Sequence, residues 1–143
     1  MEILYTYTPR TGLPKPPKQG YVNDAGFDLF TSRDQWIPPL GHMDLHTDLR
    51  VALPEGVWGR ITGRSSSVRK GLLVSEGIID TGFRGELFFG VLNLRPWPRR
   101  IKQGTRLAQL ILHQHLDGSV EWTNCPHLPP SDRGRRGFGS TGG

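Results

Sequence analysis

Hydrophobic and polar residues alternate along much of the chain with a period of two, which is typical of β-strands that bury one face. The alternation is clearest over residues 44–53. On one face stand Leu45, Thr47, Leu49, Val51 and Leu53, and on the other Asp44, His46, Asp48, Arg50 and Ala52. Shorter runs of this kind lie at residues 3–7, 57–61, 72–74, 87–94 and 107–113. No segment carries a helical apolar stripe longer than a turn or two, so the pattern predicts an all-β fold.

Turn residues separate these runs and narrow the kind of β fold that we expect. The 143 residues include 19 glycines and 12 prolines, and many short strands joined by tight turns favour a sandwich, a jelly roll or a barrel. A single helical turn is expected at residues 68–71. The length suits one domain. We expect a β-rich core at residues 1–124 and a flexible, glycine- and arginine-rich arm at residues 125–143, where the strand pattern is lost.

Charge and composition narrow the functions that are possible. The formal net charge is +5, and a basic surface attracts anions such as nucleic acid, acidic lipid or a polyphosphate. The apolar runs are too short to cross a membrane, and the N-terminus lacks the pattern of a secretory leader. We therefore expect a cytoplasmic protein with no membrane partner. The single cysteine, Cys125, excludes an intrachain disulfide framework and a Cys-rich zinc module.

The segment Gly63-Arg64-Ser65-Ser66-Ser67 has the composition of a phosphate-binding loop. Arginine offers a planar fork to phosphate oxygens, serine hydroxyls add neutral donors, and backbone N–H groups at a turn add more. A serine-rich surface loop without a ligand is the alternative for so short a string.

A second motif, at residues 77–87, puts Asp80 after two branched apolar residues and before a glycine turn. A carboxylate held at the end of a strand can be aimed at a water molecule and accept its proton as a general base. The alternative is an ordinary turn aspartate, which turns of this kind favour.

The tail at residues 133–143 combines arginines and glycines with one aromatic residue, Phe138. Glycine lets a backbone approach a ligand closely, and arginine binds phosphate. A phenylalanine on such an arm can stack on a nucleobase. The alternative is a disordered basic tail without a ligand.

Taken in order, these motifs resemble those of the trimeric dUTPase family. The five motifs of that family are matched by residues 25–29, 63–67, 77–87, 104–110 and 133–143, so that the resemblance covers almost the whole chain. It implies a jelly-roll-like dUTPase fold, a homotrimer, and hydrolysis of dUTP to dUMP and pyrophosphate with Mg²⁺. In this family each active site is assembled from three subunits, with the arm of one closing the site.

The resemblance also implies a role for each matching residue. Asp80 would activate the water that attacks the α-phosphorus, and Phe83 would pack on the deoxyribose and exclude a 2′-hydroxyl. Asp28 would hold waters around the Mg²⁺ ion, and Gly77 with its neighbours would read uracil. The remaining implied contacts are Arg64, Ser65, Ser66, Gln109 and Arg133 with the phosphates, and Phe138, Gly139 and Ser140 in the closing arm, with Phe138 over the uracil ring.

The chain departs from the family pattern at two places. Phe83 stands where the family commonly has tyrosine, so the ring is kept and a hydroxyl is lost. Arg135 and Arg136 stand where small residues are often found, and they add positive charge beside the closing arm.

Two other functions stay open at this point. A related dCTP deaminase, or a bifunctional deaminase and dUTPase, would need a glutamate at the position that Gly90 occupies. A single-stranded nucleic-acid-binding module would use the basic tail, although nucleic acid is not expected as the main partner. His113 and His115 are expected to form a solvent-facing pair, because a third metal ligand is missing.

Overall fold

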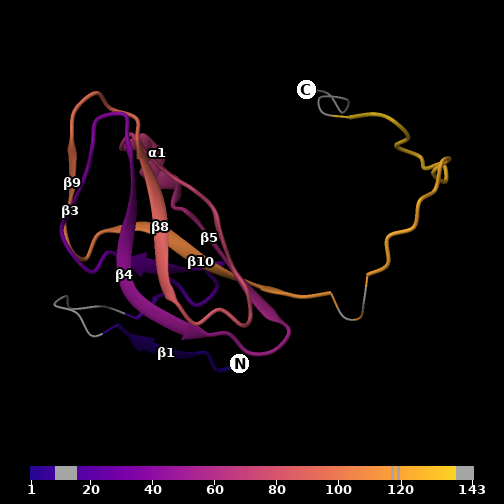
Figure 1. The fold of residues 1–143 in the computed structure, drawn as a ribbon, viewed down its shortest axis with the longest axis horizontal. Helices are drawn as coiled ribbons and strands as arrows, with labels where there is room; N and C mark the ends of the chain where they lie inside the picture. The colour runs from indigo at the N-terminus through magenta and orange to yellow at the C-terminus, as the bar shows by residue number, and fades with distance from the viewer. Residues whose placement is uncertain (9–15, 117, 119, 138–143) are drawn as a thin grey trace.

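The computed structural model describes residues 1–8, 16–116, 118 and 120–137, and its regular structure there is almost entirely β (Figure 1). The all-β prediction is confirmed. The elements are β1 Leu4–Tyr7, β2 Gly26–Phe30, β3 Gln35–Ile37, β4 His42–Ala52, β5 Val57–Gly63, α1 Ser65–Arg69, β6 Leu72–Val74, β7 Gly77–Ile79, β8 Glu86–Asn93, β9 Arg99–Ile101 and β10 Arg106–Gln114.

The strands form two four-stranded sheets and one small two-stranded sheet. One sheet has the order β1-β4-β8-β6, the other the order β2-β10-β5-β7, and β3 pairs with β9. Among the described residues, the strands of all three sheets pair antiparallel. The core lies where apolar faces of the two sheets meet, and it includes Leu45, Leu87, Phe89 and Val91 from the first sheet and Leu29, Ile61, Leu107 and Leu110 from the second. Each such side chain contributes on the order of 1.5–3 kcal/mol by leaving water.

The strands that the sequence predicts correspond to β1, β4, β5, β6, β8 and β10. The strands β3, β7 and β9 were not predicted. Three residues show at most one alternation, so strands of this length are easily missed, although the equally short β6 was predicted. The strand β2 was also missed, since its sequence, Gly26–Phe30, was interpreted only as a motif. The helical turn begins three residues earlier than expected, at Ser65.

The alternation expected over residues 44–53 fails at Asp48, which was assigned to the outer face. Its side chain is buried, with 1% exposure, and its backbone has a positive φ of 54°. The cause is a register shift in the pairing of β4 with β8, between His46 and Arg50. A bulge of this kind turns one side chain from the outer to the inner face.

A polar network compensates for the burial of Asp48. Arg33 Nη2 lies 2.9 Å from Asp48 Oδ1, and His46 Nδ1 lies 2.7 Å from Glu86 Oε2. Burial opposes ionisation of Asp48, but hydrogen bonds from Glu86 and Arg33, together with the charge of Arg33, outweigh it and hold the pKa of Asp48 below its usual value. Burial, together with the hydrogen bond to Asp48, raises the pKa of Glu86 despite the opposing effect of His46. Of these two carboxyl groups, Glu86 therefore binds a proton more readily than Asp48.

Asp48→Asn is expected to lower the free energy of unfolding by about 2 kcal/mol at neutral pH, because Arg33 keeps its charge and loses its partner. Urea unfolding followed by tryptophan fluorescence measures this. A carboxyl group with a lowered folded-state pKa stabilises the fold above its unfolded pKa and loses that effect as the pH falls through the folded value. The difference between the two proteins should therefore shrink below about pH 4.

Glu76→Gln is the matched control, since Glu76 is an exposed residue 3.8 Å from Arg60 and such surface pairs contribute little. Equal urea midpoints for Asp48→Asn and the unmodified protein at pH 7 would show that the Asp48 network does not stabilise the fold.

Beyond β10 the described residues of the segment 115–137 form no helix or strand, and their side chains are exposed. Figure 1 shows the described part of this segment leaving the sandwich and extending away from it. The division into a core at residues 1–124 and an arm at residues 125–143 stays a prediction. In the part of the chain that the structure describes, no helix is long and apolar enough to cross a membrane.

Candidate functional site

One pocket collects several of the residues that the motifs selected. It has a volume of about 500 Å³ and lies between β2, the start of α1 and β10. Asp28, Arg64, Ser65 and Gln109 line it together with Arg106, Tyr21 and Asp24. We call it the β2–β10 pocket.

The sheet register brings these side chains together. Asp28 on β2 is the partner of Gln109 on β10, and Ala108 on β10 is the partner of Gly63 on β5. Arg64, which follows Gly63, therefore emerges beside the same part of β10. Three segments that are far apart in the sequence thus meet at adjacent positions of one sheet.

Asp28 carries the negative charge at the centre of this arrangement. Its Oδ1 lies 3.0 Å from Arg64 Nε, and its Oδ2 lies 3.2 Å from Arg106 Nη1. The Asp28 side chain is largely buried, at 14% exposure, while both arginine side chains are more exposed. The carboxylate therefore orients two guanidinium groups, and the three residues together keep a net positive charge that suits an anionic ligand.

Gln109 is held by the backbone around it. Its Nε2 donates to the carbonyl oxygen of Gly63 at 3.3 Å. A β-carbon on Gly26 would overlap the amide group of Gln109, so a larger residue at that position of β2 would displace the Gln109 side chain. The first and fourth motifs therefore depend on each other through a direct contact.

The three serines of the motif at residues 63–67 differ in their surroundings. Ser65 is exposed and lines the pocket. Ser66 is half-buried and is not among the residues that line it. Ser67 is buried, and its Oγ donates to the carbonyl oxygen of Leu107 at 2.8 Å. The last serine thus anchors α1 to β10, and this structural role was not predicted.

Asp80 lies outside the β2–β10 pocket, in the turn that follows β7. It is exposed, and the Phe83 N–H donates to its carbonyl oxygen at 3.0 Å. The ring of Phe83, with 43% exposure, lies over Gly85, where an added β-carbon would come within 2.6 Å of Phe83 Cζ. Gly77, at the start of β7, is half-buried beside Ile61.

Within one chain, the Asp80 turn and the β2–β10 pocket lie at different ends of β5. Ile79 is the partner of Gly59, whereas Arg64 follows five residues after Gly59. At about 3.3 Å per residue these positions are about 16 Å apart along the strand. The structure therefore groups the predicted residues into two sets rather than one.

Arg133 lies in the exposed segment after β10 and takes part in a local turn. Its Nε donates to the carbonyl oxygen of Arg136 at 2.9 Å, and Arg136 Nε donates back to the carbonyl oxygen of Arg133 at 3.0 Å. In the described part of the chain, the hydrogen bonds of Arg133 stay within this turn and reach neither of the two sets. Phe138, Gly139 and Ser140 lie outside the described residues.

His113 and His115 do not form the solvent-facing pair that we expected. His113 is half-buried and stacks on Trp58, with the ring centroids 4.4 Å apart. His115 lies beyond the end of β10, and its Nε2 is 3.2 Å from Thr81 Oγ1. The cross-strand position of Trp58 next to His113 in the register explains the difference, because an aromatic neighbour covers one face of the ring.

One group of possible metal ligands stands out in the described part of the chain. The ligand atoms of His46, Asp48 and Glu86 lie within 4.8 Å of one another. This group sits on β4 and β8, in the sheet opposite the β2–β10 pocket, and Arg33 already pairs with Asp48. Asp28, the predicted metal-associated residue, is not part of it.

Comparison with known proteins shows which family this chain belongs to. A model of the dUTPase family matches residues 15–142. The deoxyuridine 5'-triphosphate nucleotidohydrolase of Candida glabrata is 39% identical over 127 residues, which cover 88% of this chain and 88% of that protein. A protein of the same name from avian adenovirus 8 is 38% identical over 128 residues, covering 89% of this chain and 77% of that protein. The chain belongs to the dUTPase family.

Solved structures confirm the dUTPase fold that the sequence predicts. The dUTPase of Staphylococcus bacteriophage 80alpha with dUPNHPP superposes with a TM-score of 0.84 at 25% identity, over 99% of this chain and 98% of that chain. A mutant dUTPase from phage phi11 of S. aureus, described with a structural Mg(II) ion, gives a TM-score of 0.78 at 21% identity, over 90% of this chain and 100% of that chain.

Sequence reasoning missed Arg106, Tyr21 and Asp24 as residues of the pocket. Arg106 lies inside the fourth motif, and its charge next to Gln109 could have selected it. Tyr21 and Asp24 lie just before the first motif, and Asp24 Oδ2 accepts from the Tyr21 N–H at 2.8 Å. A tyrosine and an aspartate in a turn next to glycines occur in many loops. The sequence alone therefore does not show that this turn lines a pocket.

Proposed function

We propose that this chain is a dUTP diphosphatase, which hydrolyses dUTP to dUMP and pyrophosphate by attack of water on the α-phosphorus. Membership of the dUTPase family and the β2–β10 pocket with its two arginines support this function. The reaction would take place inside the cell, where it limits uracil incorporation into DNA and supplies dUMP for thymidylate synthesis. The observation that carries the proposal is the Asp28–Arg64–Arg106 cluster beside Gln109 in this family.

The pocket residues bind and orient the triphosphate in this mechanism. Arg64 offers a planar fork to phosphate oxygens, while Ser65, Ser66 and the Gln109 amide supply neutral donors. Arg133 adds a contact to the terminal phosphate from the arm. Phosphoryl transfer depends mainly on such positioning and on stabilisation of charge, so no nucleophilic side chain is required.

Asp80 acts as the general base. Its carboxylate accepts a proton from the attacking water, and the leaving pyrophosphate carries away the negative charge. Phe83 packs on the deoxyribose, and its exposed ring supports this role because the ring is free to meet a ligand. Gly77 and its neighbours contact uracil through backbone groups, and Phe138, Gly139 and Ser140 belong to the arm that covers it.

The residues of the pocket fit a Mg²⁺ ion that is bound mainly by the triphosphate. Asp28 and Asp24 both line the pocket, and carboxylate oxygens suit this hard cation. Both oxygens of Asp28 already accept from arginines, which favours a contact through water over direct ligation. When bound, the ion would neutralise part of the triphosphate charge.

We further propose that three copies assemble as a homotrimer with shared active sites. A general base must stand next to the water that attacks the α-phosphorus, yet Gly59, which pairs with the residue before Asp80, is about 16 Å from Arg64 along the chain direction of β5. Asp80 from one copy and the β2–β10 pocket of another would remove this separation. Light scattering on the purified protein should give three times the mass of the chain.

Pyrophosphate release from dUTP, dCTP, dTTP and UTP with Mg²⁺ tests the proposed activity. Hydrolysis of dUTP alone is expected. Ammonia release from dCTP would indicate a deaminase instead. The glutamate that deamination requires would stand at position 90, where this chain has a glycine and therefore no carboxylate.

Phe83→Ala should lower the ratio of dUTP to UTP hydrolysis by roughly tenfold, because loss of the ring opens space for a 2′-hydroxyl. The ratio of kcat/KM for the two substrates measures this. Phe83→Tyr is the matched control and should stay close to the unmodified protein, since the ring is kept. An unchanged ratio in the alanine variant would mean that other residues recognise the sugar.

A further inference from the structure

The Asp80 carboxylate is not held by another group in the described part of the chain. Within the described part of the chain, no hydrogen bond or ion pair reaches it, and it is exposed. A base must nevertheless stand within hydrogen-bonding reach of the water that it activates. Its position is therefore determined by the backbone on either side, at Ile79 and at Thr81.

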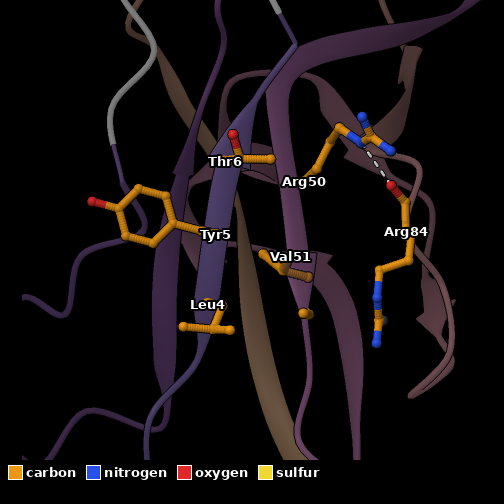
Figure 2. Close-up of a pocket in the computed structure, with 7 residues that line it drawn as sticks. Leu4, Tyr5, Thr6, Arg50, Val51 and Arg84 are labelled. Carbon is orange, nitrogen blue, oxygen red and sulfur yellow. Dashed lines mark hydrogen bonds between the residues drawn. The ribbon is translucent and has the colours of Figure 1, made fainter.

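The backbone before and after the turn is held in place. Ile79 is buried at 8% exposure and pairs with Gly59. On the far side, Arg84 Nη1 donates to the carbonyl oxygens of Thr81 at 2.8 Å and Phe83 at 2.9 Å. Arg50 Nε of β4 donates to the carbonyl oxygen of Arg84 at 2.7 Å (Figure 2). Both residues line a pocket of about 260 Å³ to which β1 and β4 also contribute.

Thr81, the residue directly after Asp80, is fixed by its side chain. Thr81 Oγ1 donates to the carbonyl oxygen of Val57 at 2.5 Å, and His115 Nε2 lies 3.2 Å from the same oxygen. A threonine hydroxyl has one hydrogen, which the Val57 carbonyl takes, so His115 must donate through Nε2–H. Neutral His115 with its hydrogen on Nε2 and protonated His115 both satisfy this, so the contact survives protonation of the ring.

His115 is itself anchored without its side chain, because its backbone N–H donates to the carbonyl oxygen of Gly56 at 2.9 Å. The Thr81 hydroxyl therefore connects the end of β7 to the start of β5 and to the residue that follows β10. The chain leaves the sandwich after β10 (Figure 1), which ends at Gln114, directly before His115.

We propose that Thr81 is a positioning residue for the Asp80 carboxylate. The His115 ring holds the Thr81 side chain in the orientation in which its hydroxyl donates to Val57. The proposal rests on the proposed function, in which Asp80 is the base. Release of the Thr81 hydroxyl lets the turn shift relative to β5 and moves the carboxylate away from the water. A displacement of about 1 Å in such a group can cost as much as a hundredfold in rate.

Thr81→Val tests this proposal, because valine keeps the branched shape and removes the hydroxyl. We expect kcat for dUTP to fall by roughly tenfold or more, with KM within about twofold of the unmodified protein. Thr81→Ser keeps the hydroxyl and should restore most of kcat. Thr6→Val, the same change at an exposed threonine on β1, is the control and should leave kcat and KM unchanged.

His115→Ala should reduce kcat by roughly threefold to tenfold, and His115→Gln, whose amide can donate, should lose less. Combined with Thr81→Val, the alanine change should add almost nothing, because both remove one network. Additive losses would overturn the assignment of His115.

Three results would overturn the role of Thr81: an unchanged kcat in Thr81→Val, a rise in KM alone, or a fall in kcat that serine does not rescue and that follows a lower melting temperature. Asp80→Asn, assayed in parallel, keeps this test separate from the proposed function. An inactive asparagine variant beside a fully active Thr81→Val would overturn the positioning role alone.

Discussion

Asp80→Asn is expected to bind dUTP almost normally and to lose at least roughly a hundredfold in kcat. Asparagine keeps the size and shape of the side chain, but its amide cannot accept the proton of the attacking water. The fold should be unaffected, since Asp80 is exposed and no hydrogen bond or ion pair in the described part of the chain uses its carboxylate.

The measurement is a single-turnover rate together with a dissociation constant for a non-hydrolysable dUTP analogue. Glu55→Gln, which changes another exposed carboxylate, is the matched control and should keep full activity. A turnover near that of the unmodified protein would mean that Asp80 is an ordinary turn residue, and the base would then have to be sought elsewhere.

The sequence predicted the long strands well because hydrophobic burial on one face leaves a period of two. A strand of three residues shows this period poorly, and β3, β7 and β9 were missed while the equally short β6 was predicted. Asp48 shows a second limit. The bulge in β4 depends on how that strand pairs with β8, and a local alternation contains no information about pairing between strands that are 40 residues apart.

The candidate site shows the same division between local and long-range information. The motifs selected Asp28, Arg64 and Gln109, and the sheet register brings these three together. The ion pairs of Asp28 with Arg64 and Arg106 could not be predicted, since they depend on β2, β5 and β10 lying side by side. Nor could the contact of His115 with Thr81, which joins residues 34 positions apart.

The physical character of the pocket follows from the balance of its charges. Two guanidinium groups around one carboxylate leave a positive excess, while the carboxylate holds both groups in defined orientations before a ligand arrives. Such preorganisation lowers the entropic cost of binding. A dianionic or more highly charged phosphate chain would therefore meet donors that are already directed toward the pocket.

Removal of residues 131–143 should leave the core folded and reduce kcat/KM for dUTP by roughly a hundredfold. Residues 131–137 are exposed in the structure, so their loss exposes little apolar surface and costs little stability. What is lost is the Arg133 contact to the terminal phosphate and the cover that Phe138 would form over uracil. Both would exclude water and fix the α-phosphorus for attack.

A shorter truncation separates the two contributions. Removal of residues 138–143 keeps Arg133 and takes away Phe138, so the loss should be smaller and should leave phosphate binding largely intact. Phe138→Trp gives an independent readout, because a tryptophan that stacks on a base has its fluorescence quenched. Quenching beyond that of the unmodified protein, whose four tryptophans are the background, is expected when a non-hydrolysable dUTP analogue binds. An unchanged spectrum at saturation, together with full activity of the longer truncation, would rule out a closing arm and leave the role of Asp80 intact.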